Sequence, residues 1–292
     1  MLQRIIYRFR RLVAILPIQD SIRYFLTCLA KLPQFIRKRK FDLLLVDKTV
    51  RRRVRVRYKG VEIVVDCPKI DRLMGEPSII FSGVREMYAK DVYLRRFDLS
   101  RIRFRTVIDA GGNCGLFTIF AAKLAEQVIW IDAQESMFHP ALAVLREDNA
   151  PPGKIVEVGG LLVGTEDKQS LESGVTAPYL RSRGVRELVG FFGRIALFTM
   201  RDLIDQHVKD RISFLKMDVE GFEFSVIRDS DDWLQRVDNI AMEVHRDAGD
   251  PLEIVKALEK NAFRVVTVDE ELRPTPASTA AYVYASATGA LK

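Results

Sequence analysis

The segment VIDAGGNCGLFTIFAAKLA, residues 107–125, combines a buried strand, a glycine-rich turn and a helix in one short unit. Val107 and Ile108 are β-branched and apolar, as an interior strand of a parallel sheet requires, and Asp109 ends the strand. Gly111 and Gly115 allow the backbone to bend sharply and to approach a ligand closely. Because apolar residues then recur at helical spacing, the unit predicts a nucleotide-type site at a helix N-terminus.

The spacing of this turn separates two classes of cofactor. A dinucleotide fingerprint G-x-G-x-x-G beginning at Gly111 needs glycine at positions 113 and 116, where the chain has Asn113 and Leu116. A carboxylate at Asp109 would repel a pyrophosphate, but it suits a cationic amino-acid end such as that of S-adenosylmethionine. Asp132 ends a second apolar strand 23 residues later, where a carboxylate can accept both hydroxyls of a ribose. The alternative is an ordinary tight turn without a ligand.

The composition fits one large enzyme domain with an N-terminal extension. The chain has 292 residues, 48% of them hydrophobic, which is enough for a full core. Its three cysteines have no C-x-x-C spacing, which argues against a zinc site and a disulfide framework and favours the cytoplasm. We expect a basic amphipathic helical extension over residues 1–50, a hairpin and helical lead-in over 51–105, and the main domain over 106–292.

The positive charge of the chain is concentrated in residues 1–60. This segment holds 17 Lys and Arg residues against three Asp, a local net charge of +14, whereas the whole chain carries +7. Two apolar stripes recur there at helical spacing among basic residues, and a basic cluster occupies residues 37–40. The first stripe comprises Leu2, Ile5, Ile6, Phe9, Leu12, Val13 and Leu16, and the second comprises Ile22, Phe25, Leu26 and Leu29.

Three interpretations of this extension stay open at this point. Residues 1–40 lie on an anionic membrane surface, form a helical cap packed on the main domain, or serve as a nucleic-acid arm. The arginines alternate with large aliphatic residues rather than with stacking aromatics, so nucleic acid is not an expected partner. No apolar run reaches the roughly 20 residues that cross a bilayer. Basic residues near an anionic leaflet contribute about 1 kcal/mol each, enough together to hold the protein reversibly at the inner membrane face.

The rest of the chain predicts alternating strands and helices, as in a doubly wound α/β sheet. A hairpin is expected over residues 54–65 with its turn at Lys59-Gly60, and helices over Arg85–Phe97 and Phe138–Asn149. The polar stretch 164–193 is expected to form loops. Further strands are expected over residues 154–158, 196–199, 212–217, 239–244, 263–268 and 281–285.

The segment FLKMDVEGFEFSVI, residues 214–227, repeats the pattern of buried strand, turn and helix. Asp218 and Glu220 follow its strand, and ligands of open α/β sheets bind beyond the carboxyl ends of the strands. Glu243 and His245 end the next strand and, being two residues apart, share one face of an extended chain. These four residues form a candidate cluster for accepting a proton. The alternative is that each is an ordinary helix cap or structural group.

The motifs VIDAGGNCGLF, LREDNA and FLKMDVEGFEFSVI, with the strand end at Asp132, lie in this order over residues 107–245. Together they resemble the FkbM family of S-adenosylmethionine-dependent methyltransferases. The resemblance implies a Rossmann-like class I methyltransferase sheet and O-methylation of a sugar or other natural-product hydroxyl. The family usually has Glu-Pro where this chain has Asp132-Ala133. The cofactor-binding residues that the resemblance implies are Asp109, Gly111, Asn113, Gly115, Asp132, Asn149 and Glu86, the last with an exposed helix glutamate as the alternative.

Methyl transfer to a hydroxyl requires that the acceptor oxygen is oriented and loses its proton. We expect a carboxylate or His245 as the base, with Asp218 nearest the transferring methyl, and we expect substitution of at least one of Glu220, Glu243 and His245 to lower turnover. A divalent cation is compatible with this acidic rim, although no spacing requires one. The expected acceptor is a hydroxylated small molecule, a glycan or a lipid-linked saccharide. The alternative from another class is a catalytically silent module docked on a membrane or a partner protein.

Overall fold

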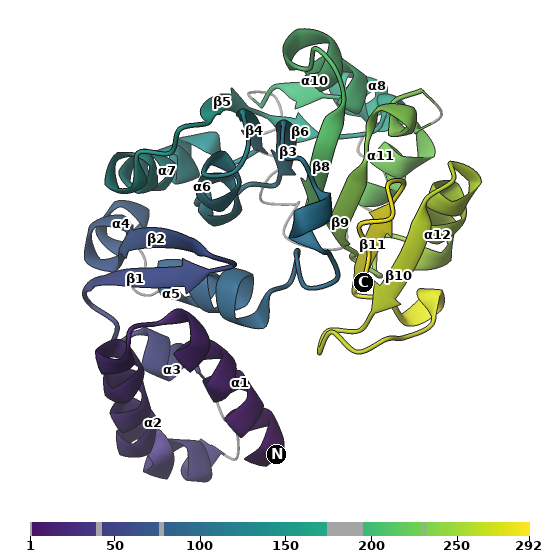
Figure 1. The fold of residues 1–292 in the computed structure, drawn as a ribbon. Helices are drawn as coiled ribbons and strands as arrows, with labels where there is room; N and C mark the ends of the chain where they lie inside the picture. Colours follow the sequence, from purple (N-terminus) through teal and green to yellow (C-terminus); the bar gives the residue numbers. More distant parts are fainter. Residues whose placement is uncertain (1, 39–42, 76–78, 174–194, 231) are drawn as a thin grey trace. The chain divides into compact units, whose positions relative to one another are not determined.

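The protein is described from a computed structural model, which covers residues 2–38, 43–75, 79–173, 195–230 and 232–292 (Figure 1). The chain divides into two compact units. The N-terminal unit comprises residues 1–92, 114–123 and 136–151, and the sheet unit comprises residues 93–113, 124–135 and 152–292. The boundaries expected at residues 50 and 105 stay predictions.

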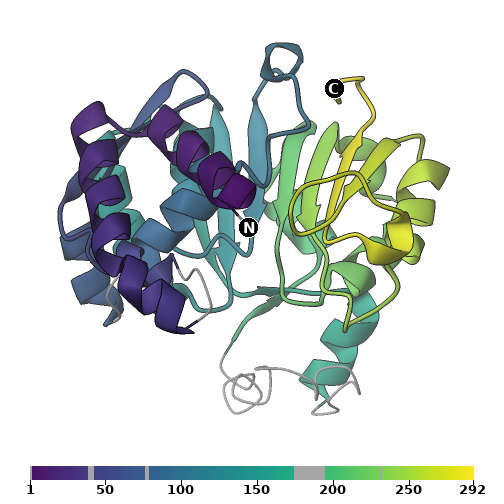
Figure 2. The ribbon, with the colours of Figure 1, turned by 90° about the horizontal axis from the view of Figure 1, so that it is seen from below.

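The sheet unit is built around a seven-stranded sheet, whose strands lie side by side in Figure 2. The strand order is β10-β11-β9-β8-β3-β4-β5, and β11 runs antiparallel to both of its neighbours while the other pairs are parallel. This is the doubly wound sheet that the alternation of the sequence predicts. The strands are β3 (Thr106–Ala110), β4 (Gln127–Asp132), β5 (Lys154–Gly159), β8 (Ile212–Met217), β9 (Asn239–Glu243), β10 (Arg264–Val268) and β11 (Tyr282–Ser286).

Helices of the sheet unit share one hydrophobic core with these strands. Every residue of β8 is buried, as expected for an interior parallel strand covered on both faces. A short parallel pair, β6 and β7, stands apart from the main sheet. The bounds are β6 (Leu161–Leu162), α8 (Thr165–Glu172), β7 (Leu197–Phe198), α10 (Met200–His207), α11 (Glu223–Arg228) and α12 (Pro251–Lys260).

The N-terminal unit contains helices and one antiparallel hairpin. None of the helices in the described part of the chain is long and apolar enough to cross a bilayer. The elements are α1 (Leu2–Ile15), α2 (Ile18–Lys38), α3 (Leu44–Asp47), β1 (Arg53–Tyr58), β2 (Val61–Asp66), α4 (Cys67–Met74), α5 (Ile79–Val84), the π-helix η1 (Arg85–Lys90), α6 (Leu116–Ala122) and all but the first residue of α7 (Glu135–Asn149).

Most of the predicted elements are confirmed. The hairpin turns at Lys59 and Gly60, which both have positive φ angles, and each predicted strand lies within two residues of an observed one. The helix expected over 85–97 is wrong beyond Lys90, because Asp91 takes a φ of 62° and accepts hydrogen bonds from Tyr58 and Lys59. The loop expected over 164–193 is wrong over α8, and its remainder from 174 lies outside the described residues.

Candidate functional site

The carboxyl ends of four neighbouring strands in the sheet unit carry the predicted acids. Asp109 lies in β3, Asp132 ends β4, Asp218 follows β8 and Glu243 ends β9. The ends of β3 and β8 are joined directly, since the Asp218 backbone N–H donates to the carbonyl oxygen of Ala110 at 3.0 Å. The expectation that these acids share one edge of the sheet is therefore met.

A buried ion pair joins Asp109 to Lys216, a residue that the sequence interpretation missed. Lys216 Nζ lies 3.2 Å from Asp109 Oδ1 and donates to the carbonyl oxygens of Gly111 at 2.5 Å and Ala110 at 3.3 Å. Burial lowers the pKa of Lys216, but the negative charges of Asp109 and Asp218 raise it by more than burial lowers it. The pKa of Lys216 therefore lies above its ordinary value. Asp109 was expected to face a cationic ligand, and in the structure it already holds a cation.

The glycines of the loop after β3 are required by packing within the protein. A Cβ on Gly111, whose φ is +68°, would lie 1.7 Å from the carbonyl oxygen of Asp218. A Cβ on Gly112 would lie 2.1 Å from the Trp130 ring. The sequence predicts close approach of a ligand at Gly111, whereas the structure shows close approach of the turn after β8.

Asp132 holds the same loop through backbone hydrogen bonds. Its Oδ2 accepts from Asn113 N–H and its Oδ1 from Gln134 N–H, both at 2.8 Å. Trp130 Nε1 donates to the Asn113 carbonyl oxygen at 3.1 Å. Burial raises the pKa of Asp132, while these backbone bonds lower it. A carboxylate has about four acceptor positions, so Asp132 retains capacity for two ribose hydroxyls.

His245 is held between two glutamates. Glu223 Oε1 accepts from the His245 backbone N–H at 2.6 Å and lies 3.0 Å from its Nδ1, while Glu220 Oε2 lies 3.3 Å from Nε2. Glu223, which the sequence interpretation did not single out, is buried, and its Oε2 accepts from Gly221 N–H at 2.9 Å. Burial lowers the pKa of His245, but both glutamates raise it to about 11. A ring protonated at both nitrogens cannot serve as a base.

Asp218 is the predicted acid best placed to accept a proton. Tyr93 Oη donates to Asp218 Oδ2 at 2.8 Å. Burial raises the pKa of Asp218 above its ordinary value, against the opposing effects of Lys216 and of the bond from Tyr93. Burial raises the pKa of Tyr93, and the negative charges of Asp218 and Glu243 raise it further. The half-buried Glu243 thus influences the site through its charge. Tyr93 therefore stays a donor.

Ligand atoms of Asp218, Glu220 and His245 all lie within 4.8 Å of one another. This group combines two carboxylates with an imidazole, a donor set that could hold a divalent cation. Binding there would require His245 to lose the proton that its two glutamates stabilise. The structure thus brings together three of the four predicted catalytic residues.

Three of the predicted cofactor residues belong to the N-terminal unit. Glu86 forms an ion pair with Lys90 at 3.3 Å on an exposed face of η1, as its alternative interpretation predicts. Asn149 exchanges two hydrogen bonds of 2.8 Å with the backbone of Val64 in β2. Gly115 has a φ of +84° at the start of α6. Cofactor contact by these residues stays a prediction.

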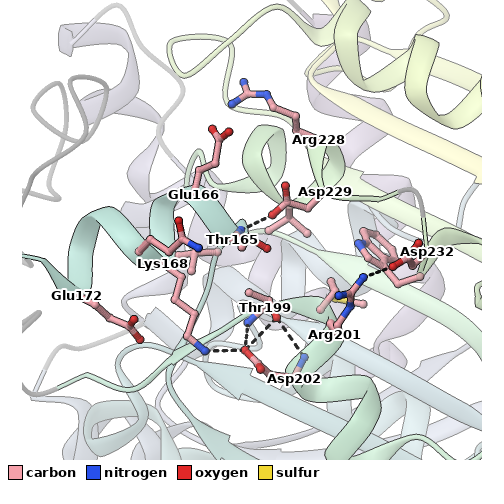
Figure 3. Close-up of a pocket in the computed structure, with 15 residues that line it drawn as sticks. Thr165, Glu166, Lys168, Glu172, Thr199, Arg201, Asp202, Arg228, Asp229 and Asp232 are labelled. Carbon is pink, nitrogen blue, oxygen red and sulfur yellow. Dashed lines mark hydrogen bonds and ion pairs between the residues drawn. The ribbon is translucent and has the colours of Figure 1, made fainter.

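A separate cavity of about 850 Å³ lies in the sheet unit among α8, α10 and the end of α11 (Figure 3). Lys168 Nζ pairs with Asp202 Oδ2 at 2.8 Å, Arg201 pairs with Asp232, and Asp229 accepts from the Thr165 backbone. None of the predicted site residues is among those lining this cavity. Four of its charged side chains thus form two ion pairs in the wall of the cavity, which is typical of a structural surface.

The mostly parallel seven-stranded sheet, with its acids at the carboxyl ends of the strands, defines a class I methyltransferase fold. Residues 194–265 match the family described as "Methyltransferase FkbM domain". This match covers about a quarter of the chain and confirms that the segment resembles the FkbM family. The match agrees with the expected cofactor class, S-adenosylmethionine. The matched segment contains Lys216, Asp218, Glu220, Glu223 and His245.

Solved structures with similar folds are distant in sequence. An rRNA methylase from Streptococcus thermophilus has 15% identity and a TM-score of 0.37, covering 67% of this chain and 89% of its own. SMU.1697c from Streptococcus mutans, solved with SAH, has 14% identity and a TM-score of 0.37, covering 68% and 95%. The N-methyltransferase NodS from Bradyrhizobium japonicum has 10% identity and a TM-score of 0.35, covering 64% and 86%. No curated protein matches the chain.

Proposed function

We propose that the protein transfers a methyl group from S-adenosylmethionine to a hydroxyl of a sugar, a glycan or a lipid-linked saccharide. The observation that carries this proposal is the environment of Asp218, a carboxylate of raised pKa at the carboxyl edge of the sheet. An unactivated hydroxyl must lose its proton to become a nucleophile, and a carboxylate whose pKa lies nearer neutrality is a more effective base.

The residues around the loop after β3 fit the cofactor. Asp132 keeps acceptor capacity for ribose hydroxyls, and its bonds to Asn113 and Gln134 fix the carboxylate beside the loop. Lys216 fixes the other side of that loop through the carbonyl oxygens of Ala110 and Gly111. When bound, S-adenosylmethionine supplies an electrophilic methyl group. In this proposal Asp109 acts through Lys216, as a positioning residue for the loop.

The proton-transfer role falls to Asp218 in this proposal. Tyr93 donates to Asp218 Oδ2, which leaves Oδ1 to receive the proton of an acceptor hydroxyl. The protonated His245 orients Glu220 and carries a positive charge beside Asp218, which favours the ionised form of that carboxylate. Glu223 positions His245 through two contacts of its Oε1.

The acceptor class is supported by the proposed location of the enzyme. The strongly cationic residues 1–60 favour the anionic cytoplasmic face of a membrane, where lipid-linked saccharides are exposed. A peripheral enzyme there meets a hydroxyl-rich acceptor without crossing the bilayer.

Methyl-labelled S-adenosylmethionine tests the proposal directly. The full chain is incubated with saccharide extracts, and mass spectrometry locates the label. We expect an O-methyl sugar with the unaltered chain and none with Asp218→Asn. Label on nitrogen or carbon, or equal labelling by the variant, would contradict the proposal. Loss of activity with a chelator and its return with a divalent cation would instead make Asp218, Glu220 and His245 metal ligands.

A further inference from the structure

Helix α2 has two apolar faces, one packed against the protein and one largely exposed, although Phe25 of the exposed face contacts the Phe9 ring at 5.1 Å between centroids. Tyr24 and Phe35 are buried on the packed face, and the Tyr24 hydroxyl donates to Asp47 at 2.8 Å. The other face carries a row of large hydrophobic residues at intervals of three and four positions, which places them along one line of the helix. The exposed row consists of Ile18, Ile22, Phe25, Leu26, Leu29, Leu32 and Ile36.

The exposure of this row is large. Ile18 is 74% exposed, Ile36 is 70% exposed and Leu29, near the middle of the helix, is 48% exposed. By contrast, Leu12 in α1 and Leu16 just after it are buried, while Val13 is 39% exposed, so the part of the first stripe whose side chains are described packs mainly inward. Contiguous exposed apolar rows of this kind mark interaction sites. The second stripe of the sequence is therefore a surface that requires a partner.

The charge beside the row is positive. Arg23 and Arg37 are exposed on α2, and neither forms an ion pair with another described residue. Asp20 is the only acid in α2, and its Oδ1 is held by Arg52 at 2.7 Å. A row of aliphatic side chains flanked by uncompensated cations is the pattern of a helix that lies in the interface of an anionic bilayer.

We infer that α2 docks the protein on an anionic lipid surface, with the row from Ile18 to Ile36 inserted among the acyl chains and Arg23 and Arg37 at the level of the headgroups. This inference deepens the proposed peripheral location by assigning it to one face of one helix, and it does not depend on methyl transfer. A symmetric contact between two copies is disfavoured, because α2 would bring the same cations together without acids to pair them.

Sedimentation of the full chain with lipid vesicles tests the inference. We expect binding to vesicles of phosphatidylcholine and phosphatidylglycerol, weak binding to phosphatidylcholine alone, and release by salt. The triple variant Ile22→Ser, Leu29→Ser, Ile36→Ser should bind at least about a hundredfold less, since each side chain loses its transfer from water. Arg23→Gln should lower binding about fivefold.

A matched control makes the same kind of substitution at exposed aliphatic residues outside α2. The triple variant Leu73→Ser, Leu124→Ser, Leu252→Ser removes three aliphatic side chains that are also exposed but lie on other elements, and it should sediment like the unaltered chain. Equal loss in both triple variants would contradict a specific role for α2. The inference would be overturned if the unaltered chain did not bind anionic vesicles. It would also be overturned if the unaltered chain were a dimer and the α2 variant a monomer.

Binding of S-adenosylmethionine separates this inference from the proposed function. The α2 variant should retain the cofactor affinity of the unaltered chain, measured by isothermal titration, because its substitutions lie on an exposed face of the N-terminal unit. Loss of vesicle binding with retained cofactor affinity supports the docking surface. Vesicle binding by the unaltered chain without any affinity for S-adenosylmethionine would leave the docking surface standing and contradict the proposed function.

Discussion

Lys216 and Asp109 lie directly opposite each other in the register of β8 and β3 and form a buried ion pair of 3.2 Å. The ammonium also binds two carbonyl oxygens at the start of the glycine loop. A cation inside the sheet therefore fixes the loop that the sequence assigns to the cofactor. This pair links the stability of the sheet to the shape of the site.

Replacing Lys216 by Met should lower the free energy of unfolding by about 3–5 kcal/mol, because it leaves the Asp109 carboxylate buried without a partner. Urea unfolding followed by circular dichroism measures the change. The double variant Lys216→Met, Asp109→Leu removes both charges and should recover part of this loss. Strictly additive effects of the two substitutions would show that the pair is not coupled.

His245 should contribute stability that depends on pH. Its folded pKa of about 11 lies above the ordinary value of 6.5, so the contribution is complete below about pH 6.5 and is lost as the pH rises towards 11. The difference in unfolding free energy between the unaltered chain and His245→Gln should therefore shrink steadily from about pH 6.5 to 10. A difference that is constant over this range would mean that Glu220 and Glu223 do not stabilise the imidazolium.

Asp218→Asn should lower kcat by about 10²–10⁴-fold while cofactor affinity changes little, as expected for loss of a general base. Tyr93→Phe is a second variant to compare, because it removes a hydrogen bond that lowers the pKa of Asp218. The acidic limb of its pH–rate profile should move to higher pH, with a smaller loss of kcat at the optimum. An unchanged limb would place the proton acceptor elsewhere.

The elements of the sheet were predictable because their signals are local. Mostly apolar runs such as Phe214–Met217, followed by an acid and a glycine, predict strand ends and turns without reference to the rest of the chain. The end of η1 was not predictable in this way. The helix ends just before Asp91, whose side chain accepts hydrogen bonds from Tyr58 and Lys59. These two residues belong to a hairpin more than 30 residues earlier in the sequence.

The sequence predicted most of the residues of the site but not their protonation states or their ion pairs. Its acids follow from strand ends, whereas the protonation of His245 depends on Glu223 from a different element. Lys216 faces Asp109 only because β8 pairs with β3, and strand order is not encoded locally. The signals that could have found these residues were a lysine in an otherwise apolar strand and a second glutamate three residues after Glu220.

Isothermal titration of the purified full chain with S-adenosylmethionine and with NAD tests the central claim most directly. We predict binding of S-adenosylmethionine and none of NAD, and a loss of about 1.5–3 kcal/mol of binding free energy in Asp132→Ala, which removes hydrogen bonds from a charged acceptor to the ribose. Circular dichroism of the variant shows that it is folded. A folded, unaltered chain that binds NAD or fails to bind S-adenosylmethionine would contradict the account.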